Sequence, residues 1–156
     1  TMRTMIMLNH LMRRIKMPNW CYNRVEICGE PEEMDEFRKL VKSKDSEFDF
    51  NKILPMPKEL DDTIKGSNHI PSEELKEKYG FDNWYDWRVH NWGTKWEADV
   101  DEGQVEDEGD YIQYAFDTAW APPDGIFYAL RRKFPEMSIS WFYDEPGMQF
   151  AGYLNE

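Results

Sequence analysis

The stretch WCYNRVEICGEPEE, residues 20–33, joins a strand pattern to a helix start and so decides the first half of the fold. In its first nine residues, apolar and charged side chains alternate, which is typical of a strand with one buried face. Gly29 ends this alternation, and the proline and acidic residues that follow suit the first turn of a helix. The apolar members of the strand are Cys21, Val25 and Ile27, and the charged members are Arg24 and Glu26.

The region after this strand is predicted to be helical with one extended interruption. Apolar residues after Pro31 recur at helical spacing and predict a helix that runs to about Lys44. Residues 48–54 are expected to be extended and to pack phenylalanines on the core, while Pro55 and Pro57 exclude a central strand there. A polar loop over 58–70 and two short helices follow. The two helices are predicted over 71–79 and 82–90, with Trp84, Trp87 and Val89 of the second facing inward.

Alternation returns in the second half of the chain and predicts a hairpin. Its two strands cover 94–100 and 111–120, and a glycine-containing acidic loop over 101–110 forms the tip. The sequence then predicts a helix with an apolar stripe over 122–134. Two closing strands are predicted over 138–143 and 148–154.

In order, these elements are strand, helix, insertion, strand, strand, helix, strand and strand. This order is the split β-α-β pattern of a ferredoxin-like sandwich, an α+β fold in which helices cover one face of an antiparallel sheet. We expect about five strands, with the fifth at one edge, and an inserted helical segment. We also expect the first and third strands to run parallel, so that the loops leaving them meet at one end of the sheet.

Length and charge limit the classes of function. The chain has 156 residues, enough for one domain with a core, and a formal net charge of −12. Residues 1–16 carry four basic residues and no acid, and we interpret them as an extension upstream of a single domain over 17–156. The −16 left on that domain argues against binding a nucleic-acid backbone over a broad face. No apolar run has the length of a membrane span, and Cys21 and Cys28 point to opposite faces of one strand, which fits a reducing cytoplasm.

Several ordered blocks resemble one known family. They are MPNWCYN at 17–23, FNKILPMP at 50–57, WGTKWEA at 92–98 and F-x-T-A-W-x-P-P at 116–123, together with the closing aromatic strands. These blocks resemble the YubB ferredoxin-like domain family, whose largely uncharacterised members are carried by phages and plasmids. The resemblance covers residues 17–156. It implies a ferredoxin-like α+β domain of mobile-element origin, and it implies no enzymatic activity.

The segment NWGTKW, residues 91–96, indicates a ligand site at one end of the sheet. Hairpin pairing would bring the start of its strand to the end of the third strand, beside the N-terminus of the 122–134 helix. Free backbone N–H groups at such an end attract anions, indoles offer stacking faces, and a lysine adds a charge. We therefore expect a small nucleotide-like or anionic ligand. The expected ligand-binding residues are Trp92, Gly93, Thr94, Lys95, Thr118 and Trp120.

Packing offers an alternative explanation for each of these residues. Trp96 is expected to point into the core, because it shares the inward face of its strand with Ala98 and Val100. Trp92 and Trp120 could close the open end of the sandwich, and Gly93 could serve only a backbone angle or close packing.

The acidic hairpin tip supports a second hypothesis. Residues 97–110 hold eight acidic residues and no basic one. They could bind Ca²⁺, although their spacing does not match an EF-hand loop, or guard a sheet edge against aggregation. They could also imitate a phosphate backbone and engage a basic host protein such as a nuclease. The partner-binding residues of this alternative are Glu102, Glu106, Asp107 and Glu108.

Catalytic motifs and metal-ligand spacings do not occur, and outside residues 1–16 the histidines are His69 and His90. We therefore expect no catalytic residue, metal or cofactor. The favoured function is a non-enzymatic binding protein in the host-cell cytoplasm, which captures its small ligand to counter host defence. The acidic inhibitor of a basic protein is the alternative, and an enzyme with an unrecognised site comes third.

Overall fold

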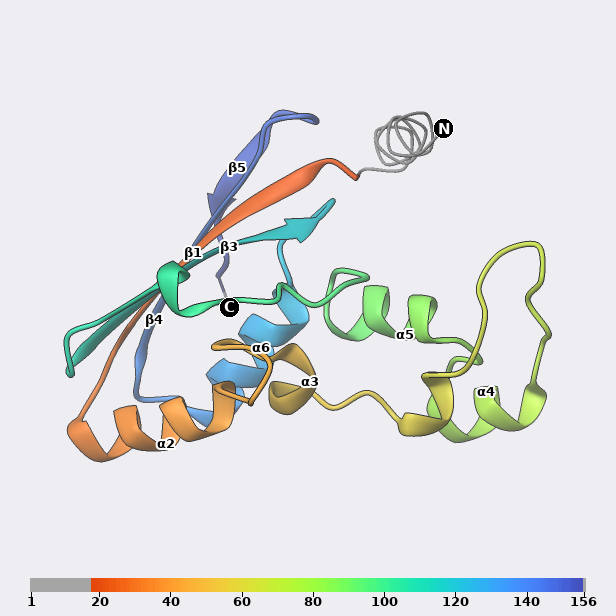
Figure 1. Ribbon diagram of the computed structural model, residues 1–156, viewed down its shortest axis with the longest axis horizontal. Helices are drawn as coiled ribbons and strands as arrows, with labels where there is room; N and C mark the ends of the chain where they lie inside the picture. Colours follow the sequence, from red (N-terminus) through yellow and green to blue (C-terminus); the bar gives the residue numbers. More distant parts are fainter. Residues whose placement is uncertain (1–17, 156) are drawn as a thin grey trace, which may run out of the picture.

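A five-stranded antiparallel sheet in the order β2-β3-β1-β4-β5 forms one layer of the protein, of which the computed structural model describes residues 18–155. The helices lie on one side of this sheet (Figure 1). The order places β3 between β1 and β2 and adds β5 outside β4, so the ferredoxin-like α+β fold predicted from the sequence is confirmed. The strands are β1 (Trp20–Cys28), β2 (Val105–Asp107), β3 (Tyr111–Ala119), β4 (Ser138–Glu145) and β5 (Phe150–Tyr153).

Two longer helices cover the sheet, and shorter ones form an insertion between α2 and β2. Figure 1 shows α2, α3 and α6 beneath the sheet, whereas α4 and α5 extend beyond its end. The helices are α2 (Pro31–Val41), α3 (Phe50–Ile53), α4 (Glu73–Tyr79), α5 (Trp84–Asn91) and α6 (Asp124–Lys133), with 3-10 turns η1 (Lys58–Leu60) and η2 (Glu102–Gln104). No helix within residues 18–155 is both long and apolar enough to cross a membrane. The extension expected over 1–16 lies outside the described residues.

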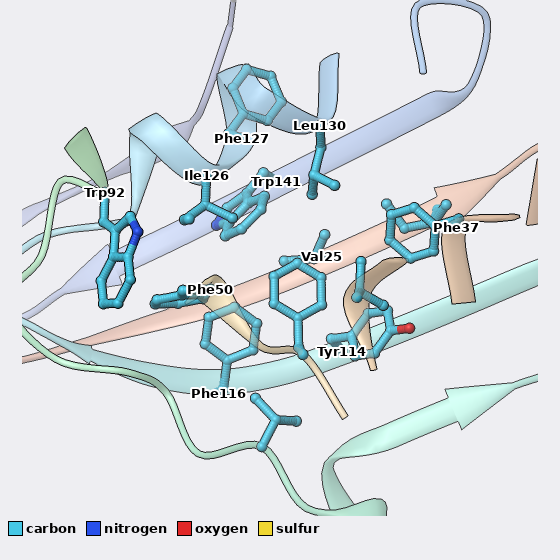
Figure 2. Packing of buried hydrophobic residues seen from close by; sticks show 14 of the residues in the cluster. Val25, Phe37, Phe50, Trp92, Tyr114, Phe116, Ile126, Phe127, Leu130 and Trp141 are labelled. Carbon is cyan, nitrogen blue, oxygen red and sulfur yellow. The ribbon is translucent and has the colours of Figure 1, made fainter. Parts of the chain in front are cut away.

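An aromatic cluster joins the sheet to the helices (Figure 2). Phe48 lies at its centre, with ring centroids 4.8 Å from Tyr114, 5.4 Å from Phe116 and 5.9 Å from Trp141. The inward residues of β1 and β3 are buried, as their alternation predicts. Cys21 is buried and Cys28 is exposed, which agrees with their odd spacing on one strand.

The extended segment expected over 48–54 is wrong in part, because residues 50–53 form α3. The Asp49 side chain accepts a hydrogen bond from Lys52 N at 3.1 Å. Glu97, which is distant in sequence, accepts from Phe50 N at 2.9 Å and from Asn51 N at 2.8 Å. These acceptors satisfy N–H groups that a one-turn helix leaves free. Phe48 and Phe50 reach the core as expected.

The strand expected over 94–100 is also wrong. These residues form no strand, and the hairpin partner of β3 is the three-residue β2, which pairs Val105 with Tyr114. Positive φ angles of 91° at Gly93 and 48° at Asp99 interrupt an extended path. Trp96 is consequently 38% exposed instead of buried in the core. In α5, Trp87 is buried as expected, whereas Val89 is 43% exposed.

The expectation of parallel first and third strands is wrong as well. β1 and β3 are antiparallel, and their register runs from Trp20 opposite Ala119 to Cys28 opposite Tyr111. In a split β-α-β unit the strand inserted between the two parallel strands runs against both. The loop at Gly29 and the loop at Trp120 therefore lie at opposite ends of the sheet.

Candidate functional site

The backbone at 91–93 crosses the start of α6 so closely that neither Gly93 nor Gly125 has room for a side chain. Gly125 N donates to Trp92 O at 3.1 Å, and a Cβ on Gly125 would overlap the carbonyl oxygen of Asn91. A Cβ on Gly93 would overlap Asp124 Oδ1 and lie 2.9 Å from Asp124 N. Gly93 also has φ of 91°, which favours glycine. The glycine of NWGTKW thus serves a backbone angle and close packing.

Trp92 is fully buried and belongs to the core (Figure 2). Its Nε1 donates to Leu54 O at 2.8 Å, and its ring lies 5.8 Å from Phe50 and 6.0 Å from Trp87. The Arg88 guanidinium lies 4.8 Å from the ring centroid. Trp92 therefore ties the insertion to the sandwich, and its indole offers no free face to a ligand.

Thr94 lies against the end of β3, which contains Thr118, but both threonines are buried and their hydroxyls bond the backbone. Thr94 Oγ1 donates to Ala119 O at 2.9 Å, and Thr118 Oγ1 donates to Ala121 O at 2.7 Å. Thr118 also accepts from Asn23 Nδ2 at 2.9 Å. These hydroxyls hold the chain as it leaves β3 and are already bonded within the protein. The structure therefore does not favour the expected role of Thr94 and Thr118 in ligand binding.

The two remaining residues of the expected site do not form a pocket with Trp92. Lys95 Nζ lies 4.1 Å from the centroid of the Trp96 ring, a cation–π contact within NWGTKW. Trp120 is 46% exposed, has φ of 72°, and donates from its backbone N to Asn19 O at 2.8 Å. The geometry therefore separates a buried Trp92 from an exposed Trp120.

The N-terminus of α6 does not suit an anion. The N–H groups of its first residues already donate to backbone carbonyls over 2.9–3.2 Å. The acceptors are Pro122 O for Asp124, Trp92 O for Gly125, and Pro123 O for Ile126 and Phe127. Asp124 also places a carboxylate in the first turn. An incoming anion would meet a negative charge and N–H groups that are already bonded. The structure therefore does not favour the anion site expected at this end of α6.

A cleft of about 700 Å³ lies between α5, the start of α6 and strands β4 and β5. This volume is within the range of small-ligand sites. Gly93 lines it, and the other five residues of the expected site are not among its lining residues. The lining residues with chemical interest are Phe81, His90, Asp124, Tyr143 and Phe150.

Aromatic rings line the cleft from two directions. On the insertion side, the Phe81 and His90 rings lie 5.0 Å apart, and on the sheet side the Tyr143 and Phe150 rings lie 6.0 Å apart. The first pair comes from α5 and the loop before it, and the second comes from β4 and β5. The cleft thus presents flat apolar surface from two separate parts of the fold.

Polar groups of the cleft are mostly acceptors. Among residues 18–155, no hydrogen-bond or ion-pair partner is found for the His90 imidazole, the Asp124 carboxylate or the Tyr143 hydroxyl. Asp86 also lines the cleft, but Asn83 and Lys65 donate to it at 2.9 and 2.8 Å. These hydrogen bonds hold the pKa of Asp86 below its ordinary value. The cleft therefore combines two carboxylates with groups that are free to bond a ligand.

Two acidic residues of the segment 97–110, Asp101 and Asp107, form hydrogen bonds that hold the local structure. Asp107 accepts from Arg38 Nε at 2.9 Å and from Arg38 Nη2 at 2.8 Å, and this pairing lowers the pKa of Asp107. Asp101 caps η2 through Gly103 N at 2.8 Å. Of the four acids expected to bind a partner, Asp107 is thus already paired, whereas Glu102, Glu106 and Glu108 are exposed.

Comparison with known proteins supports the fold. The crystal structure of protein api92 from Yersinia pseudotuberculosis is similar with a TM-score of 0.53 and 14% sequence identity, over 87% of this chain and 93% of that chain. No curated protein matches the sequence. These findings support the ferredoxin-like fold, whereas the resemblance to the YubB family and a phage or plasmid origin stay predictions. Residues 91–155, which contain α6 and the strands β2 to β5, match the family of the ferredoxin-like domain in Api92-like proteins.

Proposed function

We propose that the protein is a binding protein that holds a small, flat ligand in the cleft between α5 and strands β4 and β5. The proposal rests on three side chains for which no hydrogen-bond partner is found within residues 18–155, namely His90, Asp124 and Tyr143. They line a cleft of about 700 Å³ whose walls include aromatic rings. Ligand sites typically combine apolar walls with a few converging polar groups. This cleft supports the expected class of function, and of the six expected ligand-binding residues it is lined by Gly93 alone.

The chemistry of the cleft favours one part of a nucleotide-like ligand over the other. Carboxylates accept hydrogen bonds, and a heteroaromatic ring with neighbouring N–H donors, such as an amino-substituted nucleobase, can satisfy them. Aromatic side chains offer such a ring stacking surface. A phosphate would instead face Asp86 and Asp124. The proposed ligand is therefore a neutral or cationic nucleobase-like ring, and the anionic ligand expected from the sequence is set aside.

The resemblance to mobile-element proteins gives this binding a use. A phage or plasmid protein that sequesters a base-containing host metabolite would counter a host defence that depends on it. This use rests on the implied origin of the protein, whereas the ligand class rests on the residues of the cleft.

Calorimetric titration with nucleobases, nucleosides and nucleoside monophosphates tests the proposal. We expect saturable binding of a base or nucleoside and weaker binding of its monophosphate. Asp124→Asn, which keeps the shape of the side chain, should weaken binding about five-fold or more through loss of a charge-assisted hydrogen bond. Asp110→Asn serves as the matched control, because Asp110 is exposed and lies outside the cleft. Absence of binding across the panel, or equal loss in both variants, would contradict the proposal.

A basic protein partner remains the second candidate, favoured by the exposed Glu102, Glu106 and Glu108 along the edge strand β2 and the turns beside it. Binding of this kind should weaken steeply with salt. Replacing Glu106 and Glu108 with glutamine should weaken this binding further. The hypothesis of a basic partner is contradicted if neither added salt nor these substitutions reduce the capture of a basic protein.

A further inference from the structure

A second hollow, distinct from the cleft, lies beside the start of β1. Its volume is about 310 Å³, and two indoles line it, Trp20 and Trp96, with ring centroids 6.2 Å apart and planes at 42°. Trp20 is 43% exposed and Trp96 is 38% exposed. We call this hollow, with Trp20, Trp96, Glu97, Asp99 and Asp117 in its wall, the tryptophan groove.

The charged residues that line the tryptophan groove are all acidic, and the Lys95 ammonium lies beside one of its indoles, 4.1 Å from the centroid of the Trp96 ring. Three carboxylates line the groove, and its remaining lining residues, Ala98 and Gln104, are uncharged. Glu97 is committed to α3 through Phe50 N and Asn51 N. Within residues 18–155, no hydrogen-bond or ion-pair partner is found for the carboxylates of Asp99 and Asp117. Two exposed indoles therefore stand beside two carboxylates that are free to bind.

Two exposed indoles beside free carboxylates are a setting for an organic cation. The face of an indole attracts cations more strongly than other aromatic faces do, and a neighbouring carboxylate adds a direct ion pair. Lys95 illustrates the attraction, since its ammonium lies 4.1 Å from the centroid of Trp96, and an incoming cation would compete with it for that indole. An anion or a phosphate backbone would be repelled by the same carboxylates.

We propose that the tryptophan groove binds an organic cation, a guanidinium or alkylammonium group. The cation would contact the indoles of Trp20 and Trp96 and pair with the carboxylates of Asp99 and Asp117. The size of the hollow suits a single side-chain-sized group. Such a group exists as a free small molecule and as an arginine or lysine side chain of a basic protein, and the net charge of −12 would attract either. The proposal does not depend on ligand binding in the cleft.

Tryptophan fluorescence titrated with acetyl-arginine amide and acetyl-citrulline amide tests the proposal. Citrulline has nearly the shape of arginine and lacks its charge, so the pair isolates the cation. We expect saturable quenching with the arginine amide and at least about five-fold weaker response with the citrulline amide. An arginine-rich peptide forms a second arm, because tighter binding of the peptide would identify a protein as the source of the cation, and tighter binding of the free amide would identify a small molecule.

Variants show where the cation binds. Trp96→Phe and Asp117→Asn should each weaken binding about three-fold or more, whereas Trp120→Phe, an exposed indole outside the groove, should not. Asp124→Asn, in the cleft, should also leave this binding unchanged, so the two proposals can fail separately. Circular dichroism confirms that each variant is folded. Equal responses to arginine and citrulline, or loss of binding with Trp120→Phe in place of Trp96→Phe, would overturn the proposal.

Discussion

Replacing Glu97 with glutamine should change how the stability of the protein depends on pH. Burial raises the pKa of Glu97 to about 7, although the hydrogen bonds from Phe50 N and Asn51 N act in the opposite direction. Its ordinary value is 4.5. Between these two values the folded protein retains a proton that the unfolded chain has released. The free energy of unfolding should therefore fall as the pH rises from about 4.5 to 7.

The size of this effect follows from the shift. Each pKa unit corresponds to 1.36 kcal/mol, so the full shift gives about 3 kcal/mol at most. Glutamine does not titrate and therefore removes this contribution. Its single carbonyl oxygen can accept one of the two N–H groups, so Glu97→Gln should also lose about 1 kcal/mol at every pH. By about pH 5 the wild type has lost roughly 0.8 kcal/mol of this contribution, so the two proteins should be nearly equal in stability there, and at about pH 8 Glu97→Gln should be the more stable by about 2 kcal/mol.

Urea unfolding between about pH 5 and pH 8 measures this dependence. The informative quantity is the difference in unfolding free energy between wild type and Glu97→Gln at each pH, because other groups titrate equally in both. Glu102→Gln provides a matched control, since Glu102 is exposed and belongs to the same acidic segment. Wild-type and Glu97→Gln profiles that stay parallel across the range would refute the reasoning.

Three further predictions concern single side chains. Asn23→Ala should lower the unfolding free energy by about 3 kcal/mol in urea titrations, because it leaves the buried Nε1 of Trp141, now bonded to Asn23 Oδ1 at 3.0 Å, without an acceptor. Arg38→Met should cost no more than about 1 kcal/mol, because its pair with Asp107 is partly exposed, and the cost should vanish at about 1 M salt. Asp82→Ala should raise hydrogen exchange in residues 69–91 while the sheet stays protected, because buried Asp82 accepts from Ser72 N and Asn83 Nδ2 within the insertion; uniform exchange across the chain would argue against a local role.

Local patterns in the sequence were enough to predict most of the sandwich. β1, α2, β3 and α6 each carry an alternation or a helical stripe within their own residues, and their buried faces are the expected ones. α3 could not be found in this way, because part of its capping comes from Glu97, a residue outside its own segment. β2 is three residues long, too short for an alternation to stand out.

The candidate site was harder to predict because its walls come together only in three dimensions. His90 belongs to the insertion, Asp124 to the start of α6, and Tyr143 and Phe150 to the last two strands. No sequence spacing relates these residues. NWGTKW pointed to the right region through Gly93, which lines the cleft, but its indoles divide between the core and the surface. A count of aromatic residues cannot separate a buried indole such as Trp92 from an exposed one such as Trp96.

A comparison of alanine substitutions at Gly93 and Gly109 separates two costs. One is the steric overlap where residues 91–93 cross the start of α6, and the other is the backbone strain of a positive φ angle. The φ angles of the two glycines are 91° and 93°, so alanine at either position meets nearly the same conformational penalty, about 1–2 kcal/mol. A Cβ at Gly109 would meet no atom within 4 Å, whereas one at Gly93 would overlap Asp124. Gly93→Ala should therefore be less stable than Gly109→Ala by a further 1–3 kcal/mol or so in urea unfolding, the usual cost of overpacking. It should also weaken ligand binding in the cleft, because relief of the overlap moves Asp124, whereas Gly109→Ala should leave binding unchanged. Equal stabilities for the two variants would mean that Gly93 serves its backbone angle alone and that the start of α6 can move away from the insertion at little cost.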